Sequence, residues 1–435
     1  MLATMHPSLR MALSCRRNAL PAALLLCVLV GAAGCRTHQG KPVATAPELA
    51  YAASDPRFLN EAGLLLDTTT VSGNKAREYI NGDAFFPIMI EAIRSAQHTV
   101  TLAIYLYWRG ETGRQFSEAL AERARAGVKV RISLDWFGSR CMDRKELAML
   151  RQSGAEARYY NRFSPLHPLR VNHRDHRKLL VIDGRVGFIG GAGIADCWMG
   201  NADSNKSWRD GFYRVEGPVV GQMQSVFMEN WTRISGRTEV GNDFFPELTD
   251  VGADPAHVFS NTAGAGTDRV RLFYLLAFNS ARKNIRLGMA YFIPCRATRE
   301  ALADACRRGV DVEIIVPNSR INNKLVRPMA RRHYGALLKA GARIYEYEPS
   351  MFHVKCLIVD DALVSVGSAN LDERTYRYND EANLNILSPA FAADQIRIFE
   401  ADKQRAHAIT YQAWKRRSPA GRLAEYLLVP CEPLF

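Results

Sequence analysis

The chain has 435 residues, enough for two or three domains, and its 47% hydrophobic and 23% charged residues are ordinary for a globular protein. The formal net charge of +13 favours an acidic partner, such as nucleic acid, an anionic membrane surface or a phosphorylated substrate. None of the nine cysteines stands in C-x-x-C spacing, so no zinc site is indicated. Six cysteines follow residue 40, and the sequence leaves open whether they pair as disulfides in an oxidising compartment.

Residues 1–40 are typical of a targeting segment. Arginines near the start precede an apolar run, Ala19–Ala33, which is shorter than a comfortable membrane span of about 20 residues. The run ends at Cys35 in a sequence that resembles a bacterial lipoprotein cleavage box. Three alternatives remain: a lipidated Cys35, an uncleaved signal anchor and an ordinary cleaved signal. Each predicts an exported protein of the cell envelope, because the positive flank stays inside.

The next part of the chain divides into a tether and a first set of alternating elements. Residues 41–75 are expected to form the tether, since the stretch begins with small, polar and proline-containing residues without periodicity. Helices are predicted at residues 84–96, 115–126 and 144–152, and strands at 99–106, 128–135, 155–160 and 212–220.

The second part repeats this order after a connector rich in Gly, Asp, Thr and Pro at residues 236–268. Helices are predicted at 269–282, 298–308 and 324–339, and strands at 284–293, 310–317 and 343–347, before a helical tail at 388–435. Val128 and Val310 lie 182 residues apart, and His176 and His353 lie 177 apart, so the spacing indicates an internal duplication. Alternating strands and helices predict an α/β sandwich in each half.

One octapeptide, H-x-K-x-x-x-x-D, occurs twice, at residues 176–183 and 353–360. An apolar run follows each lysine, which predicts a strand whose alternation places the histidine and the lysine on one face. The lysine supplies fixed positive charge and the imidazole can attack or carry a proton, so the pair suits a phosphate site. The candidate catalytic residues are His176, Lys178, Asp183, His353, Lys355 and Asp360.

A glycine-containing turn and a carboxylate follow each copy. Gly367-Ser368-Ala369-Asn370 precedes Glu381, and Gly190–Gly193 precedes Asp210. From about Asn81 onwards the chain resembles the phospholipase D superfamily, whose signature is a duplicated HxKxxxxD with GSxN and a downstream carboxylate. Its first copy has glycine at 191 and 193, where the family often has Ser and usually has Asn, so the polar contacts of the first half are left open.

The resemblance implies two phospholipase D-like α/β sandwich domains, at residues 76–255 and 256–435, related by a pseudo-two-fold axis with the active site at their interface. One histidine would attack phosphorus to form a phosphohistidine, and the other would protonate the leaving group. The resemblance assigns attack to His176 and acid–base work to His353, although the residues alone do not separate them. The lysines would hold the phosphoryl oxygens.

Four further residues are expected to bind substrate or orient the site. Ser368 and Asn370 can donate hydrogen bonds from the turn, and Asp210 and Glu381 can accept from imidazole N–H groups and fix the tautomer. Asp183 and Asp360 lie at the far ends of their strands, where turn capping is at least as good an interpretation as catalysis. No metal or cofactor is implied.

Within the superfamily the chain resembles the bacterial cardiolipin synthases, in stretches such as Trp208-Arg209-Asp210 and Tyr291-Phe292-Ile293-Pro294. That resemblance implies phosphatidyl transfer between two molecules of the anionic phospholipid phosphatidylglycerol, giving cardiolipin and glycerol at a membrane surface, with no nucleic-acid partner.

The alternatives are a phospholipase D hydrolase that gives phosphatidic acid, a secreted phosphodiesterase or nuclease, and a non-catalytic lipid-binding protein. A nuclease would suit the net charge, but it would need a basic groove with aromatic stacking platforms. Trp136, Trp198 and Phe352 instead stand among apolar neighbours. We expect these three aromatic side chains to pack against acyl chains and to exclude water from the site.

Overall fold

The computed structural model describes residues 43–45, 49–263 and 268–434. The leader with Cys35 lies outside these residues, so the three alternatives for it remain predictions. In the described part of the chain, no helix combines the length and the apolar character needed to cross a bilayer.

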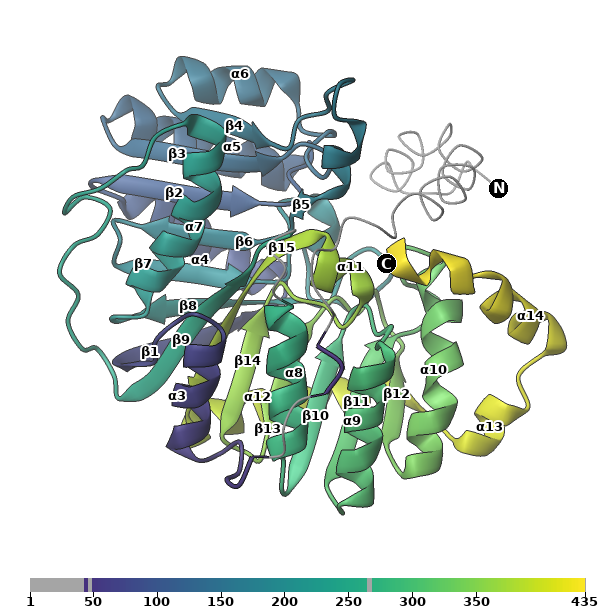
Figure 1. The fold of residues 1–435 in the computed structure, drawn as a ribbon. Coiled ribbons are helices and arrows are strands. Elements are labelled where there is room, and N and C mark those ends of the chain that lie inside the picture. Colours follow the sequence, from purple (N-terminus) through teal and green to yellow (C-terminus); the bar gives the residue numbers. More distant parts are fainter. Residues whose placement is uncertain (1–42, 46–48, 264–267, 435) are drawn as a thin grey trace.

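One large mixed sheet runs through the molecule, and its strand order repeats (Figure 1). The first-half strands are β1 (Val71–Ile80), β2 (Thr99–Ile104), β3 (Lys129–Asp135), β4 (Glu156–Tyr160), β6 (Lys178–Ile182), β7 (Val186–Gly190) and β8 (Gly211–Glu216). The second-half strands are β9 (Asp254–Asn261), β10 (Asn284–Met289), β11 (Asp311–Pro317), β12 (Arg343–Tyr347), β13 (Lys355–Val359), β14 (Leu363–Gly367), β15 (Asn379–Leu387) and the edge strand β16 (Ala406–Ile409).

The spatial order is β4-β3-β2-β6-β7-β8-β1 in the first half and β12-β11-β10-β13-β14-β15-β9 in the second. Both halves therefore follow one plan. The equivalent strands β1 and β9 pair antiparallel at the centre, which is the arrangement that a two-fold axis between the halves produces. A short strand, β5 (Arg174–Asp175), leaves the first half and pairs in parallel with β15.

Helices cover both faces of this sheet. They are α3 (Pro56–Leu65), α4 (Gly82–Ser95), α5 (Glu111–Arg125), α6 (Arg144–Gln152), α7 (Val220–Ser235), α8 (Arg269–Ser280), α9 (Arg296–Arg307), α10 (Val326–Ala340), α11 (Glu373–Arg377), α12 (Pro389–Gln404), α13 (Tyr411–Lys415) and α14 (Pro419–Leu427), with short 3-10 turns η2 (Pro168–Asn172), η3 (Asp196–Trp198) and η4 (Val429–Leu434). Gly127 after α5 and Gly309 after α9 have φ of +90° and +88°, the left-handed conformation that ends a helix.

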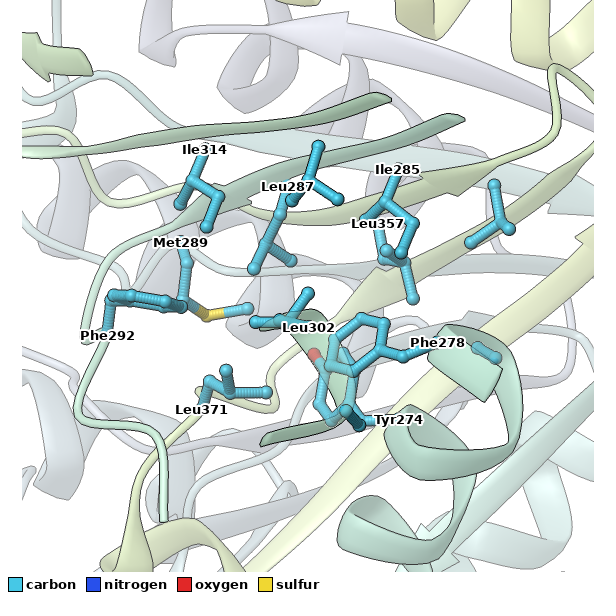
Figure 2. Close-up of a cluster of buried hydrophobic side chains, with 14 of the residues drawn as sticks. Tyr274, Phe278, Ile285, Leu287, Met289, Phe292, Leu302, Ile314, Leu357 and Leu371 are labelled. Atoms are coloured by element: carbon cyan, nitrogen blue, oxygen red, sulfur yellow. The ribbon is translucent and has the colours of Figure 1, made fainter. Parts of the chain in front are cut away.

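The core is built from alternating strand residues packed under helices. Ile285, Leu287 and Met289 of β10 are fully buried on one face, and Figure 2 shows them in one cluster with Leu302 of α9 and Phe278 of α8. A separate cluster on the other face joins the halves. It contains Leu179 and Val181 of β6 together with Val364 and Val366 of β14. Through this shared core, β6 of the first half and β14 of the second half pack into one body.

The predicted α/β class and the duplicated architecture are confirmed, but three segments differ from expectation. Residues 56–65 of the expected tether form α3, which buries Phe58 and Leu59, and β1 begins at Val71. The connector contains β9, so the boundary placed at residue 255 falls inside a strand and the division into domains remains a proposal. The tail includes the edge strand β16. Within the described part of the chain, no disulfide forms at Cys197, Cys295, Cys306, Cys356 or Cys431.

Candidate active site

A short backbone pairing carries His176 of the first half into the second half. β5 runs alongside the start of β15, and the N–H of His176 donates to the carbonyl of Asp380 over 2.9 Å. The next residue of β15 is Glu381, which is fully buried. As a result, Nδ1 of His176 lies 2.9 Å from each carboxylate oxygen of Glu381.

The same arrangement occurs in reverse at His353. A parallel bridge joins Arg209 and Phe352, and the N–H of His353 donates to the carbonyl of Arg209 over 2.8 Å. The residue after Arg209 is Asp210, and its Oδ2 lies 2.7 Å from Nδ1 of His353. Each half therefore supplies the carboxylate that holds the histidine of the other half.

The two carboxylates fix the protonation pattern of the imidazoles. A carboxylate accepts hydrogen bonds, so Nδ1 donates in both histidines and Nε2 is left with its lone pair. Glu381 and Asp210 thus contact the histidines as the sequence predicts. The exchange between halves depends on the bridges of β5 and Arg209, which no local pattern in the sequence predicts.

Both lysines of the motifs are buried beside their histidines. Nζ of Lys178 donates to the carbonyl of His176 over 2.5 Å, and Nζ of Lys355 donates to the carbonyl of His353 over 2.6 Å. Lys178 lies opposite Ile104 of β2 in the sheet register. The ammonium groups therefore sit at the same end of the repeated strands as the imidazoles.

Polar residues of the second-half turn hold Glu381. Its carboxylate accepts from the hydroxyl of Ser368 over 2.5 Å, from Nδ2 of Asn379 over 3.0 Å and from the hydroxyl of Thr375 over 3.3 Å. Asn370, predicted to bind substrate, donates its N–H to Thr375, and its Oδ1 is buried without a hydrogen-bond partner among the described residues. Asn379 and Thr375 were missed, since their spacing follows no motif used in the prediction.

A tryptophan takes the corresponding place in the first half. Nε1 of Trp198 donates to Oδ2 of Asp210 over 3.1 Å, and the N–H of Gly211 donates to Oδ1 over 2.9 Å. A Cβ at Gly191 would meet Asp210 Oδ1 at 2.4 Å, so a serine would not fit there without a shift of the carboxylate. In the first half the indole of Trp198 therefore donates to the carboxylate of Asp210, as the hydroxyl of Ser368 donates to Glu381 in the second half. This identifies the polar contacts of the first half, which the sequence left open.

Aromatic rings surround both histidines. The rings of Trp198 and Trp208 have centroids 5.4 and 5.6 Å from that of His353, and Tyr105 packs edge-to-face on His176 at 4.8 Å. Trp198 thus lies at the site as expected. Phe352 packs on a core tyrosine instead, and Trp136 stacks on Phe163 at the surface.

Burial makes the two imidazoles neutral and weakens the charge of the two lysines. Burial, together with the positive charge of Lys355, lowers the pKa of His353 to about 3, and burial and Lys178 lower the pKa of His176 well below its ordinary value. Burial also lowers the pKa of Lys178 to about 7 and that of Lys355 to about 8. A bound anion would raise all four pKa values.

The two carboxylates differ in charge. Burial raises the pKa of Glu381 to about 7, although Lys178 opposes the shift. Burial would also raise the pKa of Asp210, but His353 and Lys355 outweigh it and hold that pKa below its ordinary value. Asp210 is thus ionised at neutral pH, whereas Glu381 titrates near it.

Asp183 and Asp360 lie away from this site, at the other ends of β6 and β13. A strand of five residues spans roughly 17 Å, so neither carboxylate is near the histidines. Asp183 accepts from the N–H groups of residues 97–99, and Asp360 accepts from those of residues 282–284. Their φ values are +51° and +52°. These contacts are those of turn caps, the alternative that the sequence left open, and we propose that neither aspartate takes part in catalysis.

No group of three or more acidic, histidine or cysteine side chains arranged to hold a metal ion occurs in the described ranges. The chemistry available from the residues themselves is attack and proton transfer at two imidazole nitrogens beside two ammonium groups.

The chain matches a family model described as "Cardiolipin synthase, PLD-like domain" over residues 89–228 and 274–403. The chain belongs to this cardiolipin synthase family of phospholipase D-like proteins. Cardiolipin synthase 2 of Staphylococcus epidermidis is 31% identical over 343 residues, which are 78% of this chain and 70% of that protein. The major cardiolipin synthase of Bacillus subtilis is 31% identical over 337 residues, covering 76% of this chain and 69% of its own length.

A solved structure with the same fold supports the architecture. The phosphatidylserine synthase of Haemophilus influenzae aligns with a TM-score of 0.61 at 14% identity, covering 85% of this chain and 96% of that one. The two ranges matched by the cardiolipin synthase family model each contain one histidine and the carboxylate that serves the other. The family match therefore coincides with the duplication of the site.

Proposed function

We propose that this protein is a phosphatidyltransferase that joins two phosphatidylglycerol molecules into cardiolipin and releases glycerol. One observation carries the proposal: two neutral imidazoles, each held through Nδ1 by the carboxylate of the other half, with an ammonium group beside each. The similarity to curated cardiolipin synthases supports cardiolipin as the product, and phosphatidylglycerol is the substrate that the family resemblance implies.

In the first step His176 is the nucleophile. The bound phosphodiester anion raises the pKa of His353, so that Nε2 of this histidine takes up a proton before the reaction. Nε2 of His176 then attacks the phosphorus of the donor, the bond from phosphorus to the head-group glycerol oxygen breaks, and Nε2 of His353 gives its proton to the departing oxygen. Lys178 and Lys355 neutralise the non-bridging oxygens. The enzyme then carries a phosphatidyl group on His176.

In the second step the free hydroxyl of another phosphatidylglycerol is the acceptor. His353 removes its proton, the oxygen attacks phosphorus, and the bond to His176 breaks to give cardiolipin. Water at about 55 M competes, so transfer needs a bound acceptor and a dry site, for which oriented reactants supply effective molarities of about 10⁵ M or more. Trp198 and Trp208 cover the His353 side and contribute to excluding water.

We further propose that the site faces a membrane. The segment between β4 and β5 leads directly to His176 and exposes 48% of Phe163 and 85% of Leu166. Apolar side chains at such a rim suit contact with acyl chains. A leader ending at Cys35 would tether the protein to the same surface from outside the cytoplasm.

The mechanism is tested by replacing each histidine and measuring consumption of phosphatidylglycerol in vesicles. His176→Ala and His353→Ala should each abolish turnover, because attack and proton transfer need separate groups. Wild-type activity in either single variant would contradict the two-histidine mechanism.

A further inference from the structure

Three arginines lie along the segment that leads to His176. Arg174 and Arg140 both lie over the ring of Phe137, and Arg374 donates to Asn172, two residues before Arg174. Their charges oppose the rise that burial causes in the pKa of Tyr105, whose ring packs on His176. None of the three forms an ion pair with a carboxylate in the described chain. This group, here called the Tyr105 arginine cluster, is an excess of positive charge beside the catalytic pair.

Arg174 is the centre of the cluster. It is only 8% exposed, and its guanidinium carbon lies 3.6 Å from the centre of the Phe137 ring. Its Nε and Nη1 are buried and have no hydrogen-bond partner among the described residues. A buried cation with unused donors is costly, so its retention points to a ligand. Arg174 lies two residues before His176 on an extended segment, so both share a face.

The other two arginines are held by neutral groups. Arg140 lies 4.0 Å from the same Phe137 ring and donates to the carbonyl of Phe137 over 2.7 Å. Arg374 donates to the carbonyl and side-chain oxygens of Asn172 and to the carbonyl of Leu434. Their positive charges therefore stay available to an anion.

The charge of Asp135 acts on Arg174, but no hydrogen bond or ion pair joins the two in the described chain. Asp135 accepts instead from the N–H groups of Gly138 and Asp175. Burial raises its pKa to about 7, so it is partly protonated at neutral pH.

We propose that the Tyr105 arginine cluster binds the phosphodiester of the acceptor phosphatidylglycerol. This inference rests on the proposed function, and it adds a binding site that selects the acceptor lipid. The phosphate of the donor lipid binds to Lys178 and Lys355. In hydrolysis the acceptor is water, which brings no second phosphate to the site. In transfer the acceptor phosphatidylglycerol brings a second phosphate, and the bridging glycerol of the product joins the two. Phe163, which stacks on Trp136 near this cluster, would lie along the acceptor's acyl chains.

The first test measures acceptor choice. Full-length protein is incubated with phosphatidylglycerol vesicles containing ethanol, and cardiolipin and phosphatidylethanol are quantified together. Arg174→Gln should lower the ratio of cardiolipin to phosphatidylethanol about tenfold, because only the lipid acceptor carries a phosphate. Arg140→Gln should lower it by a smaller factor, because Arg140 is exposed and solvent screens its charge. Arg397→Gln on α12 removes one exposed charge as the matched control and should leave the ratio unchanged.

The second test measures binding without turnover. His176→Ala protein should bind two molecules of a soluble short-chain phosphatidylglycerol, and the added Arg174→Gln change should leave one. Inorganic phosphate titrated in the same way separates a lipid site from a free-phosphate site, since equal affinity for phosphate would overturn the lipid assignment.

An unchanged product ratio in Arg174→Gln, or one bound lipid in both binding variants, overturns the proposal. Phosphatidic acid without cardiolipin from the wild-type protein would overturn the proposed function instead, and the binding test would still decide whether the cluster holds a second phosphodiester.

Discussion

Glu381 holds the imidazole of His176 across a separation of 205 residues, with both carboxylate oxygens 2.9 Å from Nδ1. Asp210 holds His353 across 143 residues through one carboxylate oxygen, Oδ2, which lies 2.7 Å from Nδ1. Neither half of the chain contains both a catalytic histidine and the carboxylate that binds it, so the site forms only when the two halves pack together.

The first prediction concerns these orienting carboxylates. Glu381→Gln keeps the shape of the side chain but lets its amide present a donor to Nδ1, which favours the wrong tautomer of His176. We expect kcat to fall by about 10²–10⁴, as expected when an orienting carboxylate becomes an amide. Vesicle assays of kcat check this, with the exposed Glu300→Gln as the control. A loss below tenfold would show that Glu381 does not orient the nucleophile.

The second prediction is a bell-shaped pH profile of kcat/KM. Lys178 and Lys355 have pKa values lowered to about 7 and 8, so their positive charge is present at lower pH and is lost as pH rises through these values. The pKa of Glu381 is raised to about 7, so its negative charge is lost as pH falls through 7. The maximum should lie near pH 7, because the charge of Lys178 is already being lost above that pH.

Bound substrate changes this profile in one direction. The phosphodiester anion raises the lysine pKa values, so the alkaline limb of kcat should lie at higher pH than that of kcat/KM. Coincident alkaline limbs would mean that the lysines do not contact the phosphate.

The third prediction separates the two tryptophans beside His353. Trp198→Phe removes the Nε1 donor to Asp210 and should lower kcat about 10-fold or more, since a hydrogen bond to a charged group contributes about 1.5–3 kcal/mol. Trp208→Phe changes the neighbouring ring and keeps that bond, so it is the matched control. Equal losses in both variants would assign Trp198 a packing role only.

The fourth prediction concerns Asp360, the cap of the second motif strand. Asp360→Ala removes the acceptor of three backbone N–H groups at a positive φ and should destabilise the protein by about 1–3 kcal/mol. Thermal unfolding measures the loss. The kcat of the folded fraction should change less than twofold, and a hundredfold loss there would return Asp360 to the catalytic residues.

The fifth prediction concerns the leader. A labelled fatty acid should stay on the protein after delipidation and disappear in Cys35→Ala, if the cleavage box directs lipidation. Recovery of a soluble cytoplasmic protein with an intact leader would refute export.

The sequence was most informative where chemistry repeats at fixed spacing. The two histidines, their lysines and the two carboxylates follow from duplicated patterns, and the element order follows from alternating apolar runs. α3 and β1 were missed because their short apolar patterns were read as part of a tether, although Phe58 and Leu59 are buried in the second-half core. The exchange of carboxylates was missed because it depends on pairings between distant segments.

The central claim, phosphatidyl transfer between two lipids, is tested most directly by the products formed from phosphatidylglycerol vesicles. Purified full-length protein should convert phosphatidylglycerol mainly to cardiolipin with one glycerol released per cardiolipin, and added glycerol should drive the reaction backwards. Phosphatidic acid as the dominant product would contradict transfer and leave a hydrolase, and cleavage of DNA without lipid turnover would place the protein among the nucleases.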